Sequence, residues 1–269
     1  MERIDLIPEL ETLEAGSHLC HLYGTEEERQ DVLLNFVLQG LRKGERVICV
    51  GDDTSRREII ASLRKMGLYP TEDISSGQLL FLSAREVFTA GGRFDPQRIL
   101  AFWNLAAEEA LGEGWPAVRT TCDMSWLLDE PPGWRDNPAY ESEMNRLPRA
   151  ENCIFLFQYN QSRFDPHRQL ELLSTHPQVI LGREMCDNIY YVPPEEFPHE
   201  ETADSRLLSH LRRLKERRRW ADEIQAAKRF SEAVVETVRE PLVVLDPGLV
   251  VVKANRSFYR VFQVDADET

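Results

Sequence analysis

A histidine, a cysteine and a tyrosine lie close together near the start of the chain, at His18, Cys20 and Tyr23. Alternate side chains of a strand point to the same face, so His18 and Cys20 share one face and His21 points to the other. An imidazole beside a thiol can activate the thiolate, bind a soft metal ion or polarise a small ligand. We favour recognition of a small ligand, with packed strand residues that do no chemistry as the main alternative.

A metal ion at His18 and Cys20 is the third interpretation, and with it a thiol-based or metal-based redox sensor. Such an ion needs two further ligands, for example Cys122 or Asp123, and no second pair in the chain has metal-ligand spacing. The cysteines are dispersed without a Cys-x-x-Cys pair, which is typical of reduced thiols buried in a cytoplasmic protein. We therefore expect no cofactor at this strand.

A second group, Asp123 and Trp126, follows the predicted strand at 117–122. In ATP-binding proteins of the P-loop class an acidic residue at this place serves the magnesium ion. Without a phosphate to serve, Asp123 is expected to hydrogen-bond either a ligand or His18. Trp126 either walls an apolar pocket or belongs to the core.

A third polar group ends the most apolar strand of the chain, at Gln158, Tyr159 and Arg163. We expect these side chains, with Glu141, to converge on the same crevice as Asp123. Capping of the next helix and turn is the alternative interpretation. His176-Pro177 is interpreted as a turn.

The segment from residue 16 to residue 53 has the order strand, tight turn, amphipathic helix, strand, which is how a P-loop domain begins. The phosphate loop itself is missing, because the turn holds one glycine, no lysine and three carboxylates at Glu26, Glu27 and Glu28. Thr25 and Glu28 instead have the spacing of a capping box. ATP binding is therefore not expected, and a residual ATPase is the enzymatic alternative.

Charge and hydropathy narrow the classes of function. The 269 residues carry a net charge of −14, which argues against direct nucleic-acid binding. No run of 18 apolar residues is present and the N-terminus lacks a signal-peptide pattern, so we expect a cytoplasmic protein with no membrane span.

Strands alternate with helices through the first two thirds of the chain, which indicates βαβ units and a mostly parallel sheet. We expect strands at 19–23, 46–50, 79–82, 117–122 and 153–159, and a closing pair at 179–181 and 189–192. Ligands bind beyond the carboxyl ends of such strands. This rule points to Tyr23, Asp52 and Asp53, and to residues 123–126 and 158–160.

The last third of the chain has a different composition. A polar, proline-rich linker at 194–203 precedes residues 204–240, where two apolar stripes that are out of phase predict a dimeric coiled coil with a break in its heptads. The basic residues at 206–219 are interpreted as a solvated face or a partner for the acidic domain, with nucleic acid or anionic lipid as the alternative. Residues 241–269 form a hairpin and a helix, too little to bury a core alone.

The polar groups, taken in order, resemble the MEDS family, the sensory domain of methanogen and methylotroph regulators and of the DcmR repressor. The resemblance covers residues 5–193 and rests on these segments: Gly16-x-His18-x-Cys20-x-x-Tyr23, Gly40-Leu41-x-x-Gly44-Glu45, Asp123-Met124-Ser125-Trp126, Tyr140-Glu141, Gln158-Tyr159-x-x-x-Arg163-Phe164 and His176-Pro177. The chain departs from the family at Cys122-Asp123, where Gly-Glu is usual, so the acid is one carbon shorter. No helix-turn-helix like that of the repressor members is found.

This resemblance implies a RecA-like α/β fold with a degenerate phosphate loop and a role in sensing small hydrocarbon derivatives. The segment after residue 229 is similar to the start of a PAS domain, and the order of sensory domain, signalling helix and PAS is that of bacterial sensor proteins, often histidine kinases. We thus expect a sensory domain at 1–193, a linker at 194–203, a signalling helix at 204–240 and a PAS-like start at 241–269. No catalytic activity is expected in these residues. A small ligand in a pocket formed by His18, Cys20, Tyr23, Asp123, Trp126 and Tyr159 would bias a dimeric helix toward an output domain.

Overall fold

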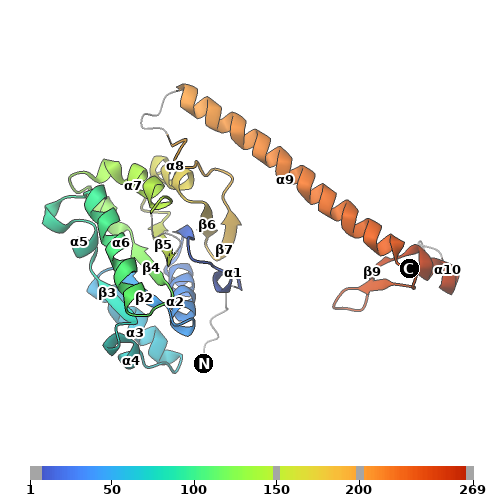
Figure 1. The fold of residues 1–269 in the computed structure, drawn as a ribbon, viewed down its shortest axis with the longest axis horizontal. Coiled ribbons are helices and arrows are strands. Elements are labelled where there is room, and N and C mark those ends of the chain that lie inside the picture. The colour runs from blue at the N-terminus through green and yellow to red at the C-terminus, as the bar shows by residue number, and fades with distance from the viewer. Residues whose placement is uncertain (1–7, 148–151, 198–202, 265–269) are drawn as a thin grey trace. The chain divides into compact units, whose positions relative to one another are not determined.

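The computed structural model describes residues 8–147, 152–197 and 203–264 (Figure 1). The chain divides into two compact units, residues 1–202 and 203–269, which are described separately. The finer division into linker, signalling helix and terminal segment stays a prediction. None of the described helices is long and apolar enough to cross a bilayer.

The first unit is built on a seven-stranded sheet with the order β3-β2-β4-β5-β1-β6-β7. Every neighbouring pair is parallel except β6 and β7. Most of these strands are buried runs of apolar residues, as strands covered on both faces must be. The strands are β1 (His18–Tyr23), β2 (Arg46–Val50), β3 (Leu79–Leu82), β4 (Val118–Asp123), β5 (Cys153–Asn160), β6 (Gln178–Leu181) and β7 (Glu184–Asp187).

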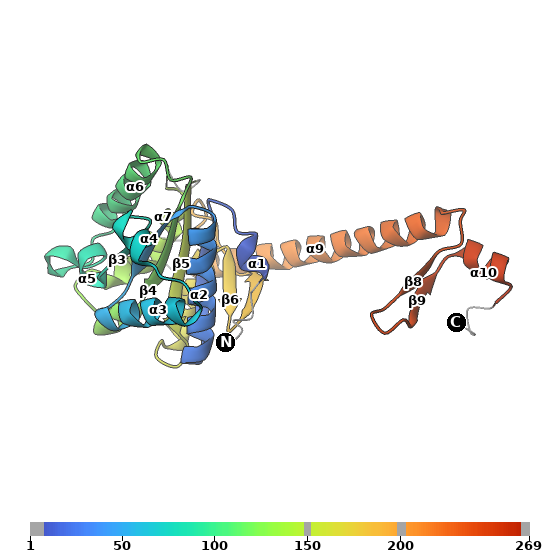
Figure 2. The same cartoon turned by 90° about the horizontal axis from the view of Figure 1, so that it is seen from below.

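Helices cover both faces of this sheet (Figures 1 and 2). Apolar side chains from α1 (Pro8–Glu11), α2 (Glu26–Arg42) and α3 (Asp53–Lys65) pack against one face. Those from α6 (Pro96–Gly112), α7 (Asn137–Met144) and α8 (Pro166–Thr175) pack against the other. The remaining short helices are α4 (Thr71–Ser75), α5 (Ala84–Val87), η1 (Ala90–Gly92), η2 (Ser125–Asp129) and η3 (Trp134–Asp136).

A buried ion pair joins the turn between α2 and β2 to strand β4. The Arg119 guanidinium, fully buried on β4, donates to Glu45 with an Nε to Oε2 distance of 2.5 Å and lies over the ring of Phe36. Gly40 allows this approach, because a Cβ there would come within 2.6 Å of Val47 and 2.8 Å of Arg119. The family pattern around Gly40 and Glu45 is therefore explained by packing.

The closing pair of strands differs from the prediction in its second member. Gly182 has a φ of +60°, so a two-residue turn follows β6 at once and Leu181 pairs with Glu184. The predicted strand at 189–192 is wrong. The side chain of Asn188 donates to the carbonyls of Leu173 and His176, which takes the chain away from the sheet. The true strand β7 is polar and half-exposed, so its sequence lacks the apolar pattern that marks the other strands.

The second unit holds α9 (Ala203–Thr237), the hairpin of β8 (Val243–Leu245) and β9 (Val251–Ala254), and α10 (Arg256–Phe262). Asn255 is fully buried where these elements meet, and its side chain bonds to the end of α9, to the start of the hairpin and to the first turn of α10. Along α9 the apolar side chains of Trp220, Ile224 and Val234 are exposed. Pairing of this helix into a coiled coil stays a prediction.

The predicted class is confirmed. The chain contains a mostly parallel α/β sheet flanked by helices, followed by a long helix and a small α+β segment. The predicted bounds of β2 and β3 agree with the structure residue for residue.

Candidate functional site

The turn between β1 and α2 is occupied by its own glutamate. Thr25 caps α2, and Glu28 completes the predicted capping box. Oε2 of Glu28 accepts hydrogen bonds from the backbone N–H groups of Gly24 at 2.8 Å and Thr25 at 3.1 Å. These two bonds lower the pKa of Glu28. In a P-loop protein a phosphate takes up backbone N–H groups at this place, so an anion would here have to displace a carboxylate.

A cavity of about 450 Å³ opens at the carboxyl ends of the strands, on the face covered by α2 and α3. Its polar wall includes Asp123 and Gln158, which are paired in register on β4 and β5. Asp52 and Asp53, at the start of α3, also line it. The rule that ligands bind at this edge therefore predicted four of its residues.

Arg29, one of the two arginines that line the cavity, is paired with two glutamates. Its Nε donates to Glu26 at 2.7 Å, and its Nη2 lies 3.2 Å from a carboxylate oxygen of Glu58. Neither glutamate lines the cavity. Burial tends to lower the pKa of Arg29, but Glu26 and, less strongly, Asp123 outweigh it and raise the pKa.

Two polar side chains of β4 face the cavity. Thr121 is 3% exposed, and its Oγ1 has no hydrogen-bond partner among the described residues. Asp123 uses Oδ1 to accept from the backbone N–H of Ser125 at 2.9 Å and from its hydroxyl at 2.6 Å. The predicted alternative that Asp123 bonds His18 is wrong, because His18 lies on the opposite face and pairs with Asn145.

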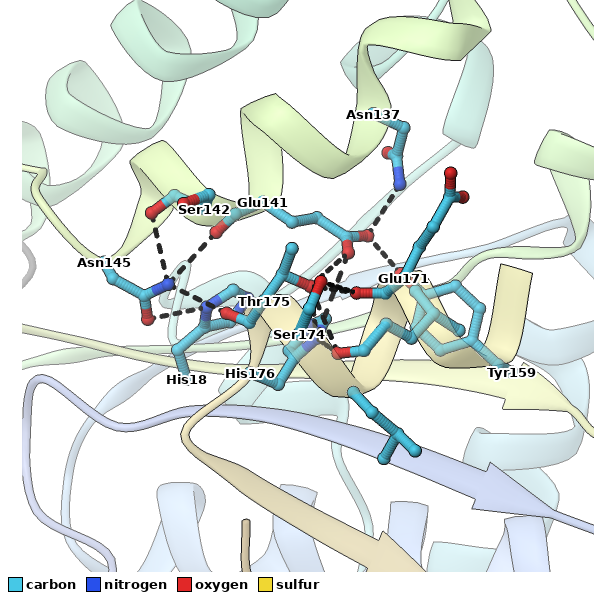
Figure 3. Close-up of polar contacts among 12 residues, drawn as sticks. His18, Asn137, Glu141, Ser142, Asn145, Tyr159, Glu171, Ser174, Thr175 and His176 are labelled. Atoms are coloured by element: carbon cyan, nitrogen blue, oxygen red, sulfur yellow. Dashed lines mark hydrogen bonds and ion pairs between the residues drawn. The ribbon is translucent and has the colours of Figure 1, made fainter. Parts of the chain in front are cut away.

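A buried polar network occupies that opposite face, between the sheet and helices α7 and α8 (Figure 3). Its centre is Glu141, whose carboxylate accepts from Asn137 at 2.9 Å, from Thr175 at 3.1 Å and from the hydroxyl of Tyr159. Burial raises the pKa of Glu141 to about 7, although these three bonds oppose the shift.

Two histidines meet at one end of the network, with ring centroids 4.3 Å apart. The amide of Asn145 donates to three carbonyls, so its Oδ1 accepts from Nδ1 of His18 at 3.1 Å. Nδ1 of His176 donates to the carbonyl of Leu172 at 2.9 Å. Each Nε2 is thus a bare acceptor, and neither finds a partner among the described residues. Burial lowers the pKa of both rings, that of His176 to about 4.

The thiol and the metal interpretations gain little from this geometry. Burial raises the pKa of the Cys20 thiol well above its usual value, which disfavours a reactive thiolate. The described residues hold no cluster of three or more His, Cys, Asp or Glu side chains suited to a metal ion. A metal ion at His18 and Cys20 would therefore find no third ligand of these types in the described chain.

The sheet divides the predicted pocket into two groups. Asp123 and Gln158 line the cavity. Tyr23 lies near them: burial raises the pKa of its hydroxyl to about 12, and the charges of Asp123 and Arg29 also act on it. The other face holds the second group, which comprises His18, Cys20, Trp126, Glu141 and Tyr159.

Trp126 takes the core position that was one of its two interpretations, and Arg163 lies apart from the other predicted residues. Trp126 stacks on Phe88 and Phe94 in the core. Arg163 is exposed on the loop after β5 and lies in neither group.

Several residues of these two sites were missed by sequence reasoning. Arg29 and Thr121 could have been found from strand and helix periodicity, because each shares a face with predicted positions. Asn145, Thr175 and His176 reach His18 and Glu141 only through tertiary packing. His176 belongs to one of the family segments but was interpreted as a turn residue.

The solved structures with similar folds include two proteins from archaea. The flagellar accessory protein FlaH from Methanocaldococcus jannaschii is 14% identical, with a TM-score of 0.46, covering 69% of this chain and 82% of that protein. A KaiC-like protein from Pyrococcus horikoshii OT3 is 11% identical, with a TM-score of 0.44, covering 62% and 71%. These likenesses concern the fold alone. No curated protein matches the chain.

Comparison with family models gives two matches. The model of a PAS domain matches residues 229–269, which confirms the predicted similarity of this segment to the start of such a domain. The model of the methanogen/methylotroph, DcmR sensory domain matches residues 17–177, which include the cavity, the capped turn and the buried network. The chain therefore belongs to the MEDS family.

Proposed function

We propose that this protein is a sensory signal-transduction module that binds a small ligand in the cavity at the carboxyl edge of its sheet. The cavity of about 450 Å³ carries the proposal, because it has the size of a small-molecule site and lies where α/β sheets bind ligands. The sensory and PAS family matches support the signalling role. The glutamate-filled turn disfavours the alternative of a residual ATPase.

The ligand contacts are assigned to Asp123 and Gln158, with Tyr23 at the margin. The buried network around Glu141 joins α7 to α8 and to strand β5. It therefore stabilises the face of the sheet opposite the cavity. The side chains of His18, Cys20, Trp126 and Tyr159 lie on the other face of the sheet and do not line the cavity. Direct contact between them and a ligand stays a prediction.

Native mass spectrometry of the purified chain tests this function. We expect a retained small organic molecule, lost in Asp123→Asn and kept in the matched control Asp187→Asn, an exposed aspartate of β7. A metal ion that is lost in Cys20→Ser would favour the metal-sensor alternative. A bare protein that shows no thermal shift with a broad panel of small molecules would refute ligand sensing and favour a scaffold.

The signal is proposed to pass through a dimer of α9 toward a PAS-type output domain, as in a sensor histidine kinase or a transcription regulator. Trp220, Ile224, Ala227 and Val234 recur at heptad spacing on one stripe, and their exposure is what a two-stranded coiled coil would cover. Neither membrane nor nucleic acid is expected as a partner.

Light scattering after size-exclusion chromatography tests the dimer. We expect a dimer for the native chain and a monomer for Ile224→Glu. The control Gln225→Glu adds the same charge one position away from the stripe and should leave the dimer intact. A monomeric native chain would refute this route for the signal.

A further inference from the structure

The cavity has an excess of negative charge. Four carboxylates line it, at Asp52, Asp53, Glu86 and Asp123, against two guanidinium groups, Arg29 and Arg56. Arg29 is also paired with two glutamates that lie outside the cavity. Arg56 stands with its Cζ 5.3 Å from the centroid of the Phe81 ring. Four carboxylates therefore face two guanidinium groups, one of which is also paired outside the cavity, and the field in the cavity favours a positive ligand.

Acceptors in the cavity match the donors of an ammonium group. Oδ1 of Asp123 is committed to Ser125, but within the described part of the chain no hydrogen bond reaches Oδ2. Thr121 lies two residues before Asp123 on β4, so both side chains point to the same side of the sheet. Its Oγ1 has no partner among the described residues. A buried hydroxyl without a partner costs free energy that a bound donor would recover.

Part of the lining is apolar. The side chains of Leu33, Cys49, Ile59 and Phe81 belong to it. A short alkyl chain would bury there against carbon and sulfur, at about 0.8 kcal/mol for each methylene removed from water.

We propose that the cavity binds a small alkylammonium ion, with its charged head between Asp123 and Thr121 and its alkyl part against Leu33, Cys49 and Ile59. This inference rests on the proposed sensory function and names the chemical class of the ligand. An alcohol of the same length has no charge, and a carboxylate of the same length has the opposite charge. The site therefore discriminates against both.

Three probes of equal chain length test the proposal on the full chain: n-butylammonium, 1-butanol and butyrate, compared at constant ionic strength by calorimetry and thermal shift. We expect binding of butylammonium alone. Asp123→Asn, which keeps the Oδ1 acceptor for Ser125, should weaken this binding by about tenfold or more, since a charged pair is lost. Thr121→Val, of nearly equal volume, should weaken it about threefold, and the control Asp187→Asn should leave it unchanged.

The outcomes separate the ligand class from the function itself. Tighter binding of 1-butanol or butyrate that is lost in the cavity variants overturns the ammonium proposal and leaves ligand sensing intact. Equal binding of butylammonium to the native chain and to both cavity variants overturns it as well. Absence of binding by all three probes, with a bare protein in native mass spectrometry, overturns both proposals.

Discussion

Glu28 bonds back to Gly24, its carboxylate accepting the backbone N–H of that glycine at 2.8 Å. The same oxygen takes the N–H of Thr25, so the first turn of α2 provides its own anion. A turn of this kind satisfies two backbone N–H groups before the helix with a side chain of the same helix. The proposed ligand site is therefore the cavity that Arg29 lines, and not the turn.

Nucleotide binding should be absent and should not return when the carboxylate is removed. In Glu28→Ala the two N–H groups are free, but Glu26 and Glu27 still repel a triphosphate and no lysine is available to hold it. Calorimetric titration with MgATP should give no heat of binding for the native chain or for the variant. Micromolar affinity in the native chain would contradict this account of the turn.

The buried pair of Arg119 and Glu45 should be a major determinant of stability. Removal of one partner leaves a charge uncompensated in the core, which typically costs about 3–5 kcal/mol. Glu45→Ala should lower the free energy of unfolding in urea by this amount, whereas Glu26→Ala, which removes an exposed partner of Arg29, should cost far less. Similar costs for the two variants would refute a special role for the buried pair.

Most strand positions were predictable because burial on both faces makes most of these strands apolar runs between polar segments, whereas the polar, half-exposed β7 was missed. The Asp123 and Gln158 pair at the carboxyl edge followed from the same pattern together with a rule of α/β sheets. The grouping of the predicted site residues did not follow. Alternation fixes which side chains share a face within one strand, but only the register between strands decides that Asp123 lies beside Gln158 and away from His18.

The buried network was not predictable for a different reason. His18 and His176 are separated by most of the sensory domain along the chain, and no periodicity joins them. Their contact, with ring centroids 4.3 Å apart, arises when the end of α8 packs against the first residue of β1. Polar residues brought together by packing alone leave no local pattern in the sequence.

Glu141 should make the stability of the sensory domain fall as the pH rises. Its pKa is about 7 in the folded chain against an ordinary value of 4.5, so between these values the native state holds a proton that the unfolded state has lost. The free energy of unfolding should therefore decrease through this range by about 3 kcal/mol, from about 1.4 kcal/mol for each unit of pKa. Glu141→Gln cannot titrate and should lack this decrease.

The buried histidines have the opposite effect on the pH dependence of the free energy of unfolding. The pKa of His176 is lowered to about 4, so its contribution is lost as the pH falls from 6.5 to that value, and His18 and His21 behave alike. The native chain and Glu141→Gln share these rings, so urea unfolding of both across the pH range isolates Glu141. A difference between the two that stays constant with pH would contradict the raised pKa.

Asn255 should hold the end of α9 to the PAS-like segment. Its Oδ1 accepts from the backbone N–H groups of Leu242 at 3.0 Å and Phe258 at 2.9 Å, and its Nδ2 donates to the carbonyls of Val238 at 3.0 Å and Glu240 at 2.9 Å. Loss of a helix cap costs about 1 kcal/mol, and this side chain serves three elements at once. In Asn255→Ala, hydrogen exchange at the amides of Leu242 and Phe258 should accelerate by about tenfold or more. In Asn255→Asp, which keeps the acceptor and loses the donor, those two amides should stay protected while the last turn of α9 exchanges faster. Equal acceleration at all of these amides in both variants would show that Asn255 does not join the helix to the segment through separate donor and acceptor bonds.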